Sequence, residues 1–317
     1  MMRIGILTFH RANNLGAALQ AYALSTYLND NVCPTEIIDY YPNNAMPARN
    51  TLLRRTMRVV KQIAGGKKQK DRYQRFAKFD AFINECRISK KVYYGDRAIE
   101  ADPPEYDLLI SGSDQIFNTA LTGNSKAYYL NFTNKTPKIS YASSFGRSAI
   151  SETEIAYIKQ YLKDFRALSA REESAKRIIE NLTDRFVESV VDPVFLLSRD
   201  KWMEIATPAK AAKYVFVYAM EKTPWLIKAI EQVRTQYGLP VKIVLGGDFQ
   251  LNVEGEIDTC CGPHEFLSYI KNAECVVTNS FHGMAFSIIF EKKFVCVAHS
   301  KRNTRLENLC KLIGEKK

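Results

Sequence analysis

The most constraining feature of this chain is a repeated pattern, in which a short apolar run ends on a small polar loop and a helical pattern follows. The runs at 107–110, 138–142, 241–245 and 275–278 are followed by SGSD, SSFG, GGD and NSFHG. Continuous apolar runs of this length are typical of parallel strands that helices cover on both faces. The pattern therefore predicts a doubly wound α/β protein that binds its ligands beyond the carboxyl ends of the strands.

The same pattern predicts two domains. It opens with a strand–helix–strand unit over residues 3–40, breaks near 193–200 and restarts at the apolar run YVFVYAM. A length of 317 residues also suits two domains of ordinary size. We therefore expect an N-terminal domain at 1–195 and a C-terminal domain at 196–317. If their strand ends face one another, the polar loops line a shared cleft.

The composition is that of a globular cytoplasmic protein. Apolar residues make up 46% and charged residues 25% of the chain, and no apolar run is long enough for a membrane helix. The first strand pattern starts directly at the N-terminus, without the features of a secretory signal. Seven cysteines without CxxC spacing are an odd number, so we interpret them as reduced thiols.

The positive charge is concentrated in one segment. Residues 51–91 contain 13 Lys and Arg against three acidic residues, which accounts for +10 of the net charge of +11. The apolar residues of this segment recur at helical spacing, so we expect a basic helical insertion in the N-terminal domain. Its role stays open between a solvated surface and a dock for an anionic membrane or a diphosphate-linked lipid. No zinc-finger or RNP-like motif accompanies it, so we expect no nucleic-acid partner.

Among four histidines, His282 is the strongest candidate for chemistry. It lies between a buried strand and a helix, where Ser280 can cap the helix and Gly283 leaves room near the backbone. An imidazole at this place can exchange a proton near neutral pH. His10 and His299 also follow strand ends and are weaker candidates. We expect no metal and no cofactor, because metal-ligand clusters, a GxSxG elbow, a Walker loop and a GxGxxG fingerprint are all missing from the sequence.

Six motifs together resemble the polysaccharide pyruvyl transferases, in the order that is typical of this family. They are NLGAALQAYAL (14–24), SGSDQIFN (111–118), YASSFG (141–146), REES (171–174), VDPV (191–194) and TNSFHGMAFS (278–287). The resemblance implies a GT-B-like α/β fold, with two Rossmann-like domains whose parallel sheets face a central cleft.

The resemblance also implies a reaction. Pyruvate passes from phosphoenolpyruvate to two hydroxyls of one sugar, forming a cyclic ketal in a repeat unit of a surface polysaccharide such as a capsule or exopolysaccharide. The acceptor is expected to be a lipid-linked oligosaccharide, which places the protein in the cytoplasm and peripherally at the inner face of the membrane. His282 matches the catalytic histidine of the family. The implied substrate-binding residues are Arg171 (for the donor's carboxylate or phosphate), Asn14, Gly16, Ser113, Asp114, Ser144, Ser280 and Gly283. Arg305 near the chain end is a further candidate, because an arginine suits an anionic substrate.

Two departures from the family pattern qualify these expectations. Phe117 stands where many members carry Trp, and relatives commonly continue beyond the equivalent of Lys317, so we expect a C-terminal domain that is truncated at its end. Two alternatives remain. One is a GT-B glycosyltransferase that uses a nucleotide-sugar donor, since the fold alone does not decide between donors. The other is a non-enzymatic, basic, membrane-associated protein.

Overall fold

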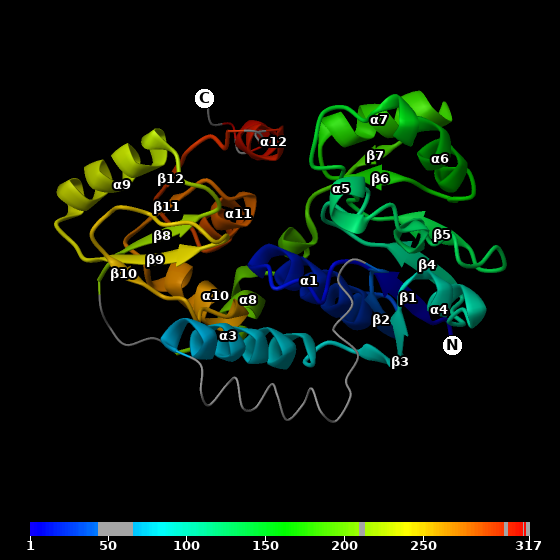
Figure 1. The fold of residues 1–317 in the computed structure, drawn as a ribbon, viewed down its shortest axis with the longest axis horizontal. Coiled ribbons are helices and arrows are strands. Elements are labelled where there is room, and N and C mark those ends of the chain that lie inside the picture. The colour runs from blue at the N-terminus through cyan, green and yellow to red at the C-terminus, as the bar shows by residue number, and fades with distance from the viewer. Residues whose placement is uncertain (44–65, 209–212, 301–303, 313, 315–317) are drawn as a thin grey trace. The chain divides into compact units, whose positions relative to one another are not determined.

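The computed structural model describes residues 1–43, 66–208, 213–300, 304–312 and 314 (Figure 1). By the contacts among its residues, the chain divides into two compact units.

The described residues of unit 1 are 1–12, 17–43 and 83–196, and all the others belong to unit 2. The main division falls after Leu196, whereas residues 13–16 and 66–82, which were expected in the N-terminal domain, group with unit 2. The first 15 residues of the basic segment, 51–65, lie outside the described residues.

Unit 1 is built on a five-stranded parallel sheet with the order β3-β2-β1-β4-β5. Its elements are β1 (Ile4–Leu7), α1 (Leu15–Asn31, whose first two residues group with unit 2), β2 (Thr35–Tyr41), β3 (Ile88–Tyr94), α4 (Asp96–Ala101), β4 (Leu108–Ser111), α5 (Thr119–Thr122), the 3₁₀ helix η2 (Lys126–Tyr129), β5 (Lys138–Ser140), α6 (Glu152–Leu162), β6 (Ser169–Ala170), α7 (Glu173–Thr183), β7 (Glu188–Ser189) and the 3₁₀ helix η3 (Pro193–Leu196).

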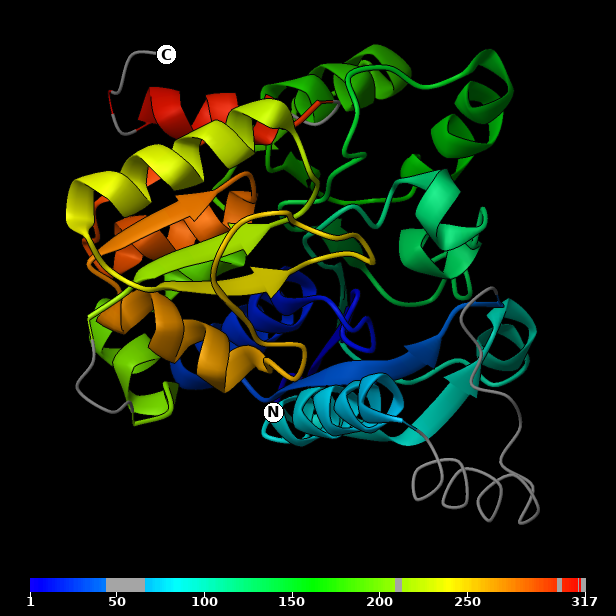
Figure 2. The same ribbon diagram turned by 60° about the vertical axis from the view of Figure 1, so that its left-hand side comes forward.

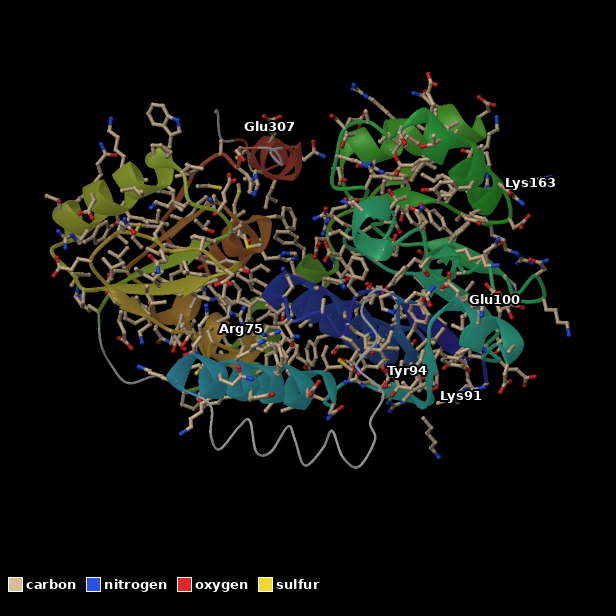
Figure 3. All side chains as sticks on the ribbon, viewed as in Figure 1. Arg75, Lys91, Tyr94, Glu100, Lys163 and Glu307 are labelled. Atoms are coloured by element: carbon tan, nitrogen blue, oxygen red, sulfur yellow. The ribbon has the colours of Figure 1, made fainter. Side chains whose placement is uncertain are left out.

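The edge strand β3 corrects part of the sequence analysis. Residues 88–91 were expected to belong to a basic helical insertion, but they form the start of β3, which pairs in parallel with β2. The exposed Lys90 and Lys91 lie on this edge strand; Lys91 and Tyr94 are labelled in Figure 3. Lysines on an edge strand discourage pairing with other chains. The positive charge of these two residues therefore protects the edge of the sheet.

A buried ion cluster joins the ends of β1 and β2. The carboxylate of Asp39 accepts hydrogen bonds from His10 Nε2 at 3.1 Å, and from Arg11 Nε and a terminal nitrogen at 2.9 and 2.7 Å. Burial raises the pKa of Asp39, but the hydrogen bonds from His10 and Arg11 outweigh it and lower the pKa from 3.8 to about 2. His10, a candidate for the cleft, thus belongs to a structural cluster of unit 1.

This cluster predicts a specific loss of stability in acid. A carboxyl group whose pKa is lower in the folded state contributes stability above its unfolded pKa, and this is lost as the pH falls towards the folded pKa. Between about pH 6 and about pH 3, we expect the free energy of unfolding of the wild type to fall by about 1 kcal/mol more than that of Asp39→Asn. Urea titrations at the two pH values measure this difference. An identical pH dependence in both proteins would contradict the assignment.

Unit 2 repeats the architecture with a second five-stranded parallel sheet, of order β10-β9-β8-β11-β12. Its elements are α3 (Lys67–Ile83, whose last residue groups with unit 1), α8 (Arg199–Ile205), β8 (Val215–Ala219), α9 (Pro224–Tyr237), β9 (Val241–Leu245), β10 (Glu256–Ile257), α10 (Pro263–Asn272), β11 (Cys275–Thr278), α11 (Phe281–Ile289), β12 (Phe294–Cys296) and α12 (Thr304–Leu312).

The central strand β8 shows why this sheet is covered on both faces. Val215 and Val217 share a core with the apolar side of α9, whereas Phe216 packs against Phe266 on α10. Successive side chains of a strand point to opposite faces, so the continuous apolar run supplies both cores. Helix α9 covers one face, and α10 covers the other (Figures 1 and 2). Because helices cover both faces of the sheet, the strand ends and the loops that follow them are held in place.

None of the helices in the described ranges is long and apolar enough to cross a membrane.

Candidate functional site

The predicted catalytic histidine lies at the start of a helix in unit 2. The buried strand β11 ends at Thr278, and Ser280 caps α11 with its Oγ, which accepts a hydrogen bond from the backbone N–H of Gly283 at 3.4 Å. His282 is therefore the second residue of α11, and its side chain is buried, with a residue exposure of 6%. The N-terminus of a helix carries a partial positive charge. This places an imidazole beside a backbone that favours an anion.

The segment Asn13–Gly16, which also belongs to unit 2, packs directly against this imidazole. A Cβ atom added to Gly16 would lie 1.9 Å from His282 Nδ1 and 2.3 Å from its Cε1. No side chain fits at that distance, so the position of the ring requires glycine at position 16. The structure thus brings together two predicted site residues that are far apart in the sequence.

Replacing Gly16 by alanine is expected to move the imidazole of His282. The methyl group has no room, and a catalytic group that is displaced by about 1 Å can cost about 100-fold in rate. We expect Gly16→Ala to lower the rate of catalysis by that order while the protein stays folded. Gly66→Ala is the matched control, because no heavy atom of the described residues lies within 4 Å of a Cβ there. The rate of product formation distinguishes the two variants, and equal rates would contradict the role of Gly16.

Gly283 has a second packing role at the same place. Its Cβ would lie 2.3 Å from Thr278 Oγ1. That hydroxyl donates to the carbonyl of Tyr218 at 2.7 Å and accepts from the N–H of Ser280 at 3.0 Å. Glycine thus lets α11 begin close to the end of β11, which holds His282 at the strand end.

Asn279 and Glu221, which were not among the predicted site residues, tie together the loops after β8, β11 and β12. Asn279 Oδ1 accepts from the N–H of Met220 at 2.7 Å, and its Nδ2 donates to the carbonyl of Glu221 at 3.0 Å. The carboxylate of Glu221 accepts from the hydroxyl of Ser300 at 2.7 Å and lies 3.3 Å from His299 Nδ1. The signal that could have found Asn279 and Glu221 was their place directly after adjacent buried strands.

The predicted residues of unit 1 also meet at strand ends. Asp114 follows β4 with a backbone φ of 73°, a left-handed conformation that is uncommon outside glycine. Its carbonyl accepts from the N–H of Ser144, the loop residue after β5, at 3.0 Å. The Ser144 hydroxyl donates to Glu172 at 2.5 Å and accepts from the N–H of Gly146 at 2.9 Å. Strained backbone of this kind is concentrated at functional sites.

Arg171 lies at the centre of this group and is fully buried among carboxylates. Its guanidinium hydrogen-bonds to Asp192, and guanidinium nitrogens lie 3.5 Å from a carboxylate oxygen of Asp114 and 3.7 Å from one of Glu172. These four residues are called the Arg171 cluster below. Burial disfavours the charged guanidinium, but the surrounding carboxylates outweigh this and raise the pKa of Arg171 above its usual value. The guanidinium thus holds three loops of unit 1 in register.

Asp114 is the carboxylate of the Arg171 cluster that reaches the surface. Its side chain is 13% exposed, whereas those of Asp192 and Glu172 are 0% and 1% exposed. The hydroxyl of Ser113, next in the chain, lies 3.5 Å from Asp192 Oδ2 and is buried. Asp114 can therefore accept hydrogen bonds from hydroxyl groups outside unit 1 while Arg171 holds it in place.

Asn14 and Arg305 are the remaining predicted substrate-binding residues. Asn14 lies half-buried in the segment that packs on His282, and the side chain of Arg305 lies outside what the structure describes. Within the described ranges, no group of three or more His, Cys, Asp or Glu side chains is placed to hold a metal ion.

A cavity of about 860 Å³ in unit 2 lies away from these residues. It is lined by Tyr214, Val241 and Tyr269 among others. Tyr214 and Val241 lie at the starts of β8 and β9, whereas His282 lies beyond the end of β11. Ligands of parallel sheets bind at the carboxyl ends of the strands, so the candidate site does not include this cavity.

Comparison with solved structures shows the fold class. The chain is similar to the HepE protein of Anabaena, solved with UDP-glucose, with a TM-score of 0.52 and 11% identity over 99% of this chain and 91% of that one. It is also similar to the UDP-GlcNAc 2-epimerase of Methanocaldococcus jannaschii, with a TM-score of 0.50 and 11% identity over 97% and 87% of the two chains. At this identity the likeness concerns the fold alone, and it confirms the predicted GT-B-like α/β class. A cleft between the two units stays a prediction.

Comparison of the sequence shows the family. No curated protein sequence matches the chain. The model of the family described as polysaccharide pyruvyl transferase matches residues 14–301, which include every motif on which the resemblance was based. The chain belongs to the polysaccharide pyruvyl transferase family.

Proposed function

We propose that this protein transfers pyruvate from phosphoenolpyruvate to two hydroxyls of one sugar, forming a cyclic ketal and releasing phosphate. The observation that carries the proposal, beside family membership, is a histidine at the first turn of α11, with its ring position enforced by Gly16. A proton donor beside a helix N-terminus suits a donor molecule that carries both a phosphate and a carbon to be protonated.

The reaction requires one proton transfer to carbon. Protonation of the methylene carbon of phosphoenolpyruvate leaves positive charge at C2, and a sugar hydroxyl attacks that carbon. A second hydroxyl of the same sugar then displaces phosphate from C2, so that two C–O bonds form and one breaks. Of the two hydroxyl protons, one balances the proton that the methyl group gained, and the other leaves with phosphate or solvent.

His282 is proposed as the general acid that protonates the methylene carbon. The positive end of the α11 dipole and the capping residue Ser280 are proposed to hold the phosphate, as an anion is stabilised at a helix N-terminus. Gly283 keeps this turn close to β11, and the segment of Asn14 and Gly16 positions the imidazole. General acid catalysis of this kind contributes about 10²–10⁴-fold to a rate.

Unit 1 is proposed to bind substrate through the Arg171 cluster. The family resemblance gives Arg171 the donor's carboxylate or phosphate, and the geometry adds a role through Asp114, which the guanidinium holds at the surface. Carboxylates form strong hydrogen bonds with hydroxyl groups, so we assign Asp114, supported by Ser113 and Ser144, to the sugar acceptor. Arg171 would then act on the acceptor as a positioning residue.

The acceptor is proposed to be a lipid-linked oligosaccharide of a surface polysaccharide, which the protein would meet at the inner face of the membrane. The test is phosphate release from phosphoenolpyruvate over a panel of glycosides and extracted lipid-linked oligosaccharides, with mass spectrometry of the acceptor. We expect phosphate and a pyruvyl ketal in equal amounts. Consumption of UDP-glucose by the same panel, with phosphoenolpyruvate untouched, would instead show a nucleotide-sugar glycosyltransferase.

A further inference from the structure

Helix α3 is packed onto unit 2 by specific contacts along most of its length. The ammonium of Lys78 lies 2.6 Å from Glu265 on α10, and the ring of Phe82 meets that of His264 edge-on at 5.0 Å. Nearer its start, Asp71 accepts a hydrogen bond from the hydroxyl of Thr259 at 2.5 Å. Figure 1 shows α3 beside α10, and Arg75 is labelled on it in Figure 3. The helix is therefore a fixed part of unit 2.

The N-terminal end of α3 presents four exposed cations. They are Lys67, Lys68, Lys70 and Arg72, and they are called the basic end of α3 below. The first turn contains no acidic residue. Lys68 lies 3.4 Å from Asp248, but both side chains are at least 90% exposed, and ion pairs of that kind contribute little to stability. The basic end thus keeps a net positive field towards solvent.

This arrangement opposes the usual placement of charge on a helix. The N-terminus carries the positive end of the helix dipole, so cations there lower the stability of the helix. An external anionic surface would offset this unfavourable interaction between the lysines and the helix dipole. The rest of the helix is held by Lys78, Phe79 and Phe82, so it tolerates the unfavourable end.

We propose that the basic end of α3 is a docking surface for a membrane that contains anionic lipids. A bilayer offers a plane of phosphates that several cations can meet at once, each favourably near the surface. The described residues of α3 expose no large apolar side chain, since Phe79, Phe82 and Ile83 are buried and Tyr73 and Phe76 are partly buried. Docking is therefore electrostatic, without insertion of the helix into the acyl region.

The test is flotation of the full chain with vesicles. Vesicles of phosphatidylcholine alone are compared with vesicles in which about one third of the lipid is phosphatidylglycerol. We expect the wild type to float only with the anionic vesicles, and to be released at roughly 1 M salt, where the Debye length is about 3 Å. Flotation with both kinds of vesicle, or with neither, would overturn the proposal.

A matched pair of variants locates the surface. The first replaces Lys67, Lys68, Lys70 and Arg72 by glutamine, and the second does the same for four exposed cations elsewhere. The second set is Lys159, Lys163, Arg177 and Lys228, of which Lys163 is labelled in Figure 3. Both variants lose the same charge, so only the position differs. We expect partitioning onto anionic vesicles to fall at least about tenfold in the first variant and to stay near the wild type in the second.

The outcomes separate this proposal from that of the reaction. Equal flotation of the two variants would overturn the docking surface. Binding to a random DNA duplex that the first variant loses and the second keeps, with no vesicle binding by the wild type, would assign the basic end of α3 to nucleic acid instead. Pyruvyl transfer to a soluble glycoside is expected to be unchanged in both variants, because none of the replaced residues lies in the candidate site. Loss of this activity in a variant would show that its fold is impaired, so the activity is measured alongside flotation.

Discussion

Replacing His282 by asparagine is expected to lower the turnover of pyruvyl transfer by about 10²–10⁴-fold, the usual contribution of a general acid. The side chain lies at the first turn of α11, where we propose that it protonates the donor's methylene carbon. Asparagine keeps hydrogen-bonding capacity but removes the proton transfer. Steady-state rates measure the contribution of His282 to turnover. A separate titration with phosphoenolpyruvate measures its contribution to donor binding.

The control for this prediction is His264→Asn. His264 also lies in the first turn of a helix of unit 2, but its Nδ1 is bonded to the carbonyl of Ile205 at 2.5 Å and its ring packs against Phe82. We expect that variant to lose stability and to keep its turnover once folded. If His282→Asn weakened the binding of phosphoenolpyruvate and left turnover unchanged, His282 would hold the phosphate rather than donate the proton.

Replacing Arg171 by glutamine is expected to destabilise unit 1 by about 3–5 kcal/mol. The change removes the guanidinium that compensates the buried carboxylates of Asp192 and Glu172 in a low-dielectric site. Urea unfolding monitored by circular dichroism measures the loss. Arg177→Gln is the matched control, because Arg177 is 72% exposed and its pairing with Glu173 is worth about 0.5 kcal/mol at most.

A double variant separates the charge from the loss of packing. Arg171→Gln combined with Asp192→Asn removes one cation and one of the carboxylates that faced it. We expect the double variant to recover part of the stability that the single variant loses, so that the coupling in the double-mutant cycle is favourable. A surface arginine would contribute about 1 kcal/mol or less. If the free energy of unfolding of Arg171→Gln lay that close to the wild-type value, the role of the cluster would be contradicted.

Much of the framework could be predicted from local sequence. Strands 241–245 and 275–278 have the predicted bounds, because each is a continuous apolar run that ends on small polar residues. Helix α9 also carries local start and stop signals, with Thr223 as its N-cap, Pro224 in the first turn and a left-handed Gly238 at its end. Strand β3 was missed because its lysines resemble those of the basic helix, and its pairing with β2 is long-range information.

The place of a candidate residue in the fold could be predicted where a single loop carries the signal, and not otherwise. His282 and Ser280 follow a buried strand and open a helix, which the sequence alone indicates. The packing of Gly16 on His282 joins distant segments, and no local pattern marks it. Arg171 was expected to face the substrate, since a lone arginine after a strand does not reveal that Asp192 and Asp114 surround it.

The central claim is that phosphoenolpyruvate is the donor, and calorimetric titration of the purified chain tests it without an identified acceptor. We predict saturable binding of phosphoenolpyruvate to the wild type and to His264→Asn, and no saturable binding of UDP-glucose to either. Saturable binding of UDP-glucose, with no heat from phosphoenolpyruvate, would contradict the account and assign the GT-B fold of this chain to a nucleotide-sugar donor.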